Sequence, residues 1–208
     1  MEPYGADVEK HAEGWLYSGK ASDRLWSKSA VGRPMGGKGL LLTDAEVIFC
    51  NQHRHLDLPH EDWFAVSLSE NSNLLDESIV IEALRVPGNK VVMSINLKYF
   101  DIEHSKLTWA ARWASDNHPR SDSPIAEIRW FHASTELDVQ DLYEWSVEVH
   151  SRERIAEVII VDDESSVVTY RVSSTEPSGE LGRLHNRDIG QIRERVFKPL
   201  ANGGVMIL

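Results

Sequence analysis

The chain has 208 residues, of which 41% are hydrophobic and 26% charged, and its formal net charge at pH 7 is −11. These proportions indicate a folded globular protein, and the negative charge disfavours general nucleic-acid binding, so any RNA contact has to be local or supplied by a partner. The single cysteine, Cys50, excludes an internal disulfide and a cysteine-based zinc site. The acidic beginning is unlike a signal peptide, and no apolar run is long enough to span a membrane, so we expect a cytoplasmic protein.

The first part of the chain, residues 1–74, is expected to form a small mixed αβ domain. Residues 13–42 alternate short apolar pairs with glycine and polar residues, which predicts small strands and turns. Thr43 is expected to cap a helix, because Glu46 stands three positions later and completes a capping box. A second short helix is predicted to follow, with Pro59 in its first turn.

Residues 75–174 are expected to form a second domain around a mixed sheet. It begins with a helix that the Pro-Gly pair at 87–88 ends, and a strand over 91–95 follows. Two more strands are predicted over 106–113 and 124–131. The overall order of helices and strands predicts an α+β or α/β fold.

The second helix of this domain is predicted to begin after Asp138. Its inward face is expected to consist of Val139, Leu142, Tyr143 and Val149. Two β-forming runs, 156–161 and 167–172, then predict a hairpin. Residues 175–208 are rich in turn formers and are expected to be an extension with one short helix near 189–197.

The tip of the predicted hairpin carries three consecutive carboxylates, Asp162, Asp163 and Glu164. Because like charges at this spacing repel one another, the tip needs an explanation. One interpretation is a turn that its charges keep solvated. The other is a docking element that meets a basic partner.

Two stretches come close to known site patterns without completing them. The Gly-Lys pair at 37–38 is spaced as in a phosphate-binding loop, but Gly39 stands where Ser or Thr would hold magnesium. His53, His55 and His60 are close in sequence, but no carboxylate or cysteine completes a tetrahedral metal set. We therefore expect a turn before a strand in the first case, and neither a metal nor another cofactor.

The order of elements and several local patterns resemble the archaeal tRNA-splicing endonucleases. The stretch "VIEALRVPGNKVV" is similar to the family pattern V-Y-x-D-L-R-x-R-G-Y-x-V, and "LKYF" and "LTWAARW" echo its next strand, of the form K-F-G-x-x-F-x-V-Y. The best match is "VHSRERIAEVIIVDDESSVVTY", which keeps His150, Asp162 and Tyr170 in register with the family. The Gly-rich stretch at 32–49 looks like the family's N-terminal domain, so the resemblance covers residues 14–174.

The resemblance implies an enzyme that cleaves precursor tRNA without metal, through a Tyr base, a His acid and a Lys that stabilises the phosphorane. In this chain Trp113, Ser123 and Arg154 stand at those positions. Trp cannot accept a proton, and Ser is not a general acid near neutral pH. Arg can stabilise an oxyanion but does not replace the other two groups.

The resemblance therefore implies a non-catalytic, structural subunit of a heterotetrameric endonuclease, which reaches precursor tRNA through a catalytic partner. In the family an acidic loop docks into a basic pocket of a neighbouring subunit, so the docking residues here are expected to be the following: Asp162, Asp163, Glu164, Val168 and Tyr170. Two alternatives stay open. One is an active RNA endonuclease with a displaced site around His118, His150 and Arg154, and the other is an interaction module without a role in RNA processing.

Overall fold

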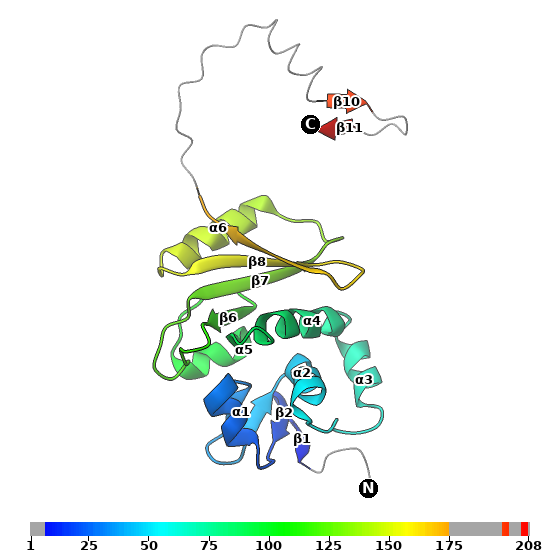
Figure 1. The fold of residues 1–208 in the computed structure, drawn as a ribbon, viewed down its shortest axis with the longest axis vertical. Helices are drawn as coiled ribbons and strands as arrows, with labels where there is room; N and C mark the ends of the chain where they lie inside the picture. The colour runs from blue at the N-terminus through cyan, green and yellow to red at the C-terminus, as the bar shows by residue number, and fades with distance from the viewer. Residues whose placement is uncertain (1–6, 175–196, 200–204, 208) are drawn as a thin grey trace, which may run out of the picture. The chain divides into compact units, whose positions relative to one another are not determined.

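The computed structural model describes residues 7–174, 197–199 and 205–207, and the chain divides into two compact units, residues 1–174 and 175–208 (Figure 1). In the second unit, β10 (Phe197–Pro199) pairs antiparallel with β11 (Val205–Ile207). The short helix expected near 189–197 lies outside the described residues, apart from Phe197, which is in β10.

The first unit begins with a four-stranded antiparallel sheet of order β1-β2-β4-β3. Its strands are β1 (Val8–His11), β2 (Gly14–Tyr17), β3 (Arg33–Pro34) and β4 (Leu40–Leu42). Between β2 and β3 lies α1 (Ser22–Ser29), where the sequence predicted only strands and turns. The helix is short and buries only Leu25 and Trp26, so its apolar pattern is a single pair and gives no helical period.

Two helices follow this sheet. Helix α2 (Asp44–Arg54) begins at the predicted capping box, in which Thr43 and Glu46 each bond the other's backbone N–H. Helix α3 (Trp63–Glu70) begins only after Asp62, so the prediction that Pro59 lies in its first turn is wrong. The acidic pair before Trp63 separates the proline from the helix.

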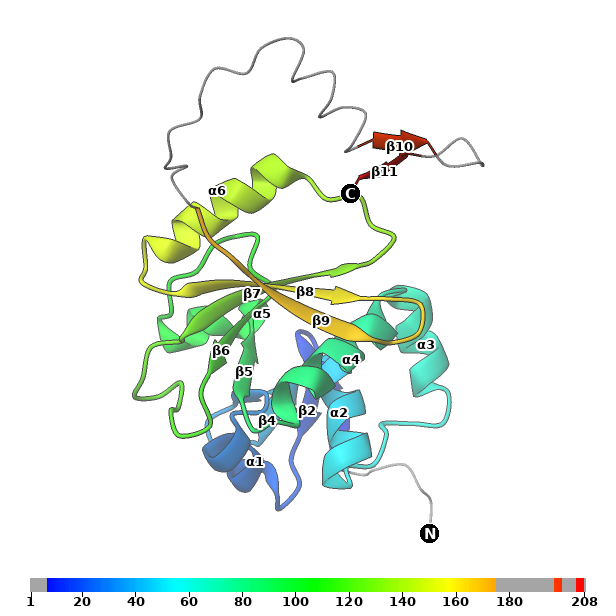
Figure 2. The same ribbon diagram turned by 45° about the horizontal axis from the view of Figure 1, so that its top comes forward.

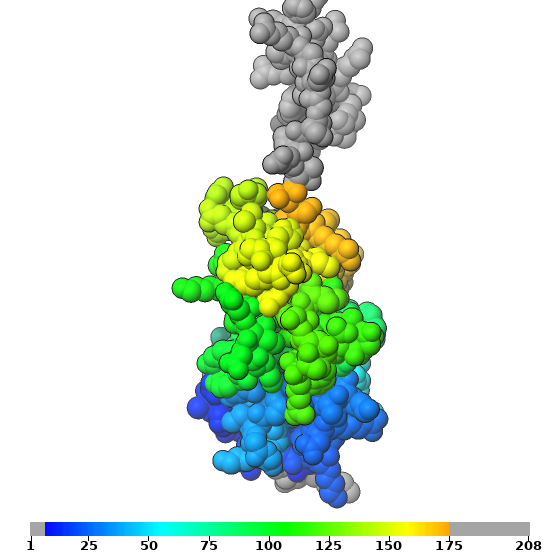
Figure 3. All heavy atoms as spheres, turned by 90° about the vertical axis from the view of Figure 1, so that its left-hand side faces the viewer, coloured from blue at the N-terminus to red at the C-terminus, as the bar shows by residue number. Residues whose placement is uncertain are grey.

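Helix α4 (Leu74–Arg85) joins the two halves of the first unit. The guanidinium of Arg85 is buried and donates to the carbonyls of Ser29 (2.8 Å) and Val91 (2.6 Å), and it lies 3.3 Å from the Glu46 carboxylate. One apolar core runs from the first sheet through this helix to the second sheet. In the space-filling view the surfaces of the two halves meet directly (Figure 3).

The second sheet has five strands in the order β5-β6-β7-β8-β9, and all neighbours are antiparallel except β7 and β8. Its strands are β5 (Lys90–Met93), β6 (Ala110–Trp113), β7 (Ala126–His132), β8 (Ile155–Val161) and β9 (Val167–Val172). Between β5 and β6 lie α5 (Ser94–Leu97) and the 3-10 helix η1 (Lys98–Phe100), so "LKYF" forms no strand. The predicted mixed α and β fold is confirmed.

Helix α6 (Val139–His150) connects the parallel strands β7 and β8, and Asp138 caps it as predicted. Its buried residues are Trp145, Ser146 and Val149, and Leu142 is partly buried against them, as predicted for Val149 and Leu142. Val139 and Tyr143 are 74% and 52% exposed, so the other half of the predicted inward face is wrong. The large indole at Trp145 decides which face is buried. Helices α6 and α4 lie on opposite sides of the sheet (Figure 2). No helix in the described ranges is both long and apolar enough to cross a membrane.

Candidate functional sites

The register of the second sheet brings the three expected catalytic positions to one end of it. Arg112 pairs with Ala126, and Ala126 in turn pairs with Ile155. Trp113 ends β6, Ser123 lies just before β7 and Arg154 lies just before β8. This end of the sheet is therefore the place where the family resemblance expects catalysis.

Trp113 is fully buried and holds the loop between β6 and β7. Its ring packs on Val92 and Leu97, and its indole Nε1–H donates to the Asp122 carbonyl at 2.9 Å. The Asp122 carboxylate accepts the backbone N–H of His118 at 2.7 Å, and this bond is the main reason why the pKa of Asp122 is lowered. The Trp113 side chain therefore has a structural role.

The side chain of Arg154 is engaged by a buried carboxylate. Its Nη1 donates to Glu127 Oε1 at 2.8 Å and to the Glu103 carbonyl at 2.5 Å, and the Glu127 side chain is 0% exposed. The other Glu127 oxygen accepts the backbone N–H of Ser105 (3.1 Å) and the hydroxyl of Thr108 (2.5 Å). Arg154 thus compensates a carboxylate that burial would otherwise penalise strongly.

A second arginine, Arg152, is engaged in the same way. It lies 2.6 Å from Glu148 and 3.7 Å from Glu127. Hydrogen bonds from Ser105 and then from Arg152 lower the pKa of Glu148. Both guanidinium groups at this end are therefore paired with carboxylates of the same chain.

The alternative residues His118 and His150 are not assembled into a site with Arg154. His118 Nε2 lies 3.1 Å from the Trp26 carbonyl, and its Nδ1 accepts the Arg120 N–H at 3.2 Å, so both ring nitrogens are engaged by the backbone of this chain. His150 is the last residue of α6. Within the described ranges no hydrogen bond or ion pair joins these three side chains.

The acidic tip divides into a structural residue and two available ones. The Asp162 carboxylate accepts the backbone N–H groups of Glu164 (3.0 Å) and Ser166 (2.8 Å), and it therefore builds the turn. Asp163 is 94% exposed, and its one ion pair within the described ranges is with His132 Nε2, at 3.4 Å. The Glu164 side chain has no hydrogen-bond or ion-pair partner in the described part of the chain.

The edge strand β9 presents an apolar surface beside this tip. Val168 and Tyr170 are 47% and 54% exposed, and they lie on the α6 side of the sheet, opposite Ile160 and Val158 of β8. A hollow of about 390 Å³ opens there. Its lining residues are His132, Ala133, Thr135, Leu137, Leu142, Val158, Ile160, Tyr170 and Val172. Only one edge of β9 is paired with a strand among the described residues.

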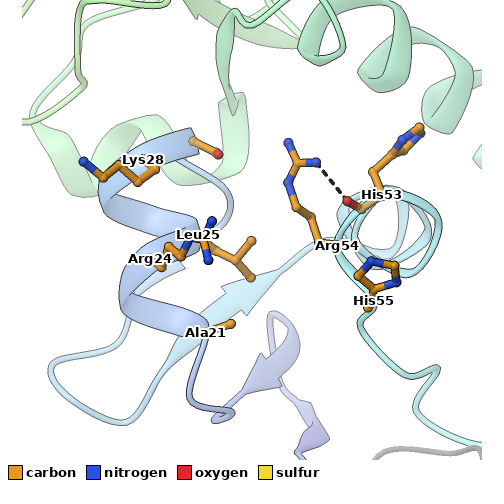
Figure 4. A pocket seen from close by; sticks show the side chains of 8 residues that line it. Ala21, Arg24, Leu25, Lys28, His53, Arg54 and His55 are labelled. Atoms are coloured by element: carbon orange, nitrogen blue, oxygen red, sulfur yellow. Dashed lines mark hydrogen bonds between the residues drawn. The ribbon is translucent and has the colours of Figure 1, made fainter.

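A third feature is a basic pocket of about 550 Å³ between α1 and the end of α2 (Figure 4). Its lining residues are Ala21, Arg24, Leu25, Lys28, Ser29, His53, Arg54 and His55. Sequence reasoning missed it, because the pocket combines two segments that are distant in the chain.

The histidines point to separate partners rather than to a shared metal. His53 is 2.9 Å from Glu82, His55 caps α2 in a left-handed conformation, and His60 lies against the ring of Trp15. No group of three or more His, Cys, Asp or Glu in the described ranges is placed to hold a metal ion. The Gly-rich stretch turns between β3 and β4, with a bond from Met35 N–H to the Gly39 carbonyl (2.9 Å), as predicted for a turn before a strand.

No protein-family model matches the chain, and a search of curated proteins found no match either. The chemistry therefore has to be argued from the sites. Cys50 is buried, which raises the pKa of its thiol to about 12 and makes it a poor nucleophile at neutral pH. The acidic tip and the basic pocket each gather charged side chains that have no partner in the described ranges, namely Glu164 in the tip and Arg24 and Lys28 in the pocket.

Proposed function

We propose that this chain is a structural, non-catalytic subunit of a heteromeric tRNA-splicing endonuclease, in which a catalytic subunit excises introns from precursor tRNA. The observation that carries the proposal is the state of the three catalytic positions. They lie at one end of the second sheet and hold Trp113, Ser123 and Arg154. The order of elements from α4 to β9 follows the order on which the resemblance rests.

Trp113, Ser123 and Arg154 cannot themselves supply acid–base catalysis of RNA cleavage. The reaction needs a base for the 2′-hydroxyl and an acid for the leaving oxygen, and both have to titrate near the working pH. Trp113 is buried and donates its N–H to the backbone, Ser123 has an ordinary hydroxyl, and Arg154 neutralises Glu127. A partner therefore has to bring the catalytic groups.

Assembly is the role that the acidic tip and the edge strand support. Asp163 and Glu164 are available for basic side chains of a neighbouring subunit, and charge pairs that are desolvated at an interface can contribute about 1.5 kcal/mol or more each. Beside them, Val168 and Tyr170 offer an apolar surface, and the free edge of β9 can accept a partner strand. The resemblance implies that such an assembly is a heterotetramer.

The test is reconstitution with a catalytic subunit that carries the Tyr, His and Lys pattern. We expect an intron-containing precursor tRNA to be cleaved by the mixture and not by this chain alone. Cleavage by this chain alone that is lost in the His118→Ala or His150→Ala variant would instead show a displaced active site. If adding this chain does not change cleavage by the catalytic subunit, the proposal is wrong and the chain has another role.

A further inference from the structure

The basic pocket between α1 and α2 stands out against the charge of the whole chain. The chain has 33 acidic and 22 basic residues, yet no carboxylate lines this pocket. Its titratable lining residues are Arg24, Lys28, His53, Arg54 and His55. A local positive potential of this kind is what a negatively charged protein needs in order to hold a polyanion.

The two helices supply the cations in different ways. Arg24 and Lys28 are one helical turn apart on the exposed face of α1, and neither has an ion-pair or hydrogen-bond partner in the described part of the chain. Arg54 extends between the helices, where its Nη1 donates to the His53 carbonyl at 2.9 Å and its guanidinium lies over the Phe49 ring (Figure 4). The α1 pair is therefore free to meet a ligand, and Arg54 is held in position.

One carboxylate touches the rim of the pocket. Glu82 of α4 pairs with His53 at 2.9 Å and engages that imidazole. The α2 C-terminus also carries the partial negative charge of a helix end, which His53 and Arg54 partly offset. Of the arginine and lysine side chains that line the pocket, Arg24 and Lys28 are the two without a hydrogen bond or an ion pair to a described residue.

We infer that this pocket binds the phosphodiester backbone of RNA, an inference that rests on the proposed role in tRNA splicing. Its volume of about 550 Å³ is in the range of pockets that hold nucleotide-sized groups. Exposed Arg and Lys side chains contact phosphates without reading sequence, as a subunit that positions varied precursors requires. Arginine clusters also bind acidic peptide motifs, so an acidic peptide is the competing ligand that the test includes. Only Ala21 and Leu25 are apolar among the lining residues, so the pocket offers a peptide little beyond its charge.

The test measures binding of the full chain to a short fluorescein-labelled RNA hairpin by fluorescence anisotropy, between about 50 and 200 mM salt. The variant Arg24→Ala/Lys28→Ala removes two cations that have no partner. The matched control, Lys38→Ala/Lys106→Ala, removes two exposed cations outside the pocket. We expect weaker binding only in the pocket variant, with the slope of log affinity against log salt reduced by about two.

Equal affinity and equal salt slope for the two variants would overturn the inference. A second result would also overturn it: an acidic peptide with the sequence of the hairpin tip binds the wild type and not the pocket variant, whereas the RNA binds both proteins equally. The RNA-binding result can be told apart from a failure of the proposed function, because cleavage by the reconstituted mixture is measured in a separate experiment. If RNA binding depends on the pocket but no mixture cleaves the precursor, the pocket is supported as an RNA-binding site and the role as a splicing subunit is refuted.

Discussion

The two ends of the second sheet differ in whether their charged side chains are paired within the protein or exposed to solvent. At the end that holds Trp113, Ser123 and Arg154, the charged groups are paired inside the molecule, and Glu127 is fully buried among its donors. At the other end, Asp163 and Glu164 face solvent. A cluster of charged residues is therefore weak evidence for a catalytic site until it is known whether each charged group is already paired within the protein. Here the paired end has a structural role, and the exposed end is the surface that we propose for docking.

The largest effect is expected from removing the arginine at the paired end. In Arg154→Ala, Arg152, at 3.7 Å, is the one cation among the described residues that still pairs with Glu127, and losing one partner of a buried pair costs about 3 kcal/mol. Urea denaturation measures the loss as a lower midpoint. Arg154→Lys is the matched control, since it keeps the charge, and it should lose clearly less. An Arg154→Ala variant as stable as the wild type would mean that this arginine is free for another role.

A smaller effect is expected within the acidic tip and separates its structural residue from the available ones. Asp162→Ala removes the acceptor of two backbone N–H groups, which should lower the free energy of unfolding by about 1–2 kcal/mol. The double variant Asp163→Ala/Glu164→Ala should change it little, because exposed charges contribute almost nothing on their own. Thermal melts of the isolated chain compare the two. Equal losses would refute this division of the tip.

The smallest effect concerns Glu77, a partly buried carboxylate without an arginine partner. Burial raises the pKa of Glu77, against hydrogen bonds from Asn71 (3.0 Å) and Trp109 (3.4 Å). Because its folded pKa lies above the ordinary value of 4.5, the folded state holds the proton more tightly, and stability falls as pH rises from 4.5 through the raised pKa.

Glu77→Gln should abolish this part of the pH dependence. The free energy of unfolding of the variant minus that of the wild type is expected to be higher at neutral pH than at pH 4, as measured by urea denaturation at both pH values. A stability difference between variant and wild type that stays constant with pH would contradict the effect of burial on this carboxyl.

Local signals in the sequence predicted much of the fold, and the contacts between distant segments decided the rest. The capping box at Thr43 and the cap at Asp138 place two helices, and the hairpin from β8 to β9 follows from its β-forming runs. The buried face of α6 followed only in part, at Leu142 and Val149, because Trp145 packs against Thr108 and strand residues that the helix pattern does not reveal. The pairing of Arg154 with Glu127 and the basic pocket equally depend on segments that meet only in the folded chain.

The central claim, that the exposed end of the sheet docks a catalytic subunit, is tested most directly by sedimentation velocity of the two subunits mixed at low and moderate salt. Asp163→Ala/Glu164→Ala is compared with Glu61→Ala/Asp62→Ala, which removes two adjacent exposed carboxylates far along the chain from the tip. We predict that the wild type and the control sediment as a heteromer, whereas the tip variant assembles at least about tenfold more weakly. An unchanged assembly profile for the tip variant would contradict docking and leave the tip as a solvated turn.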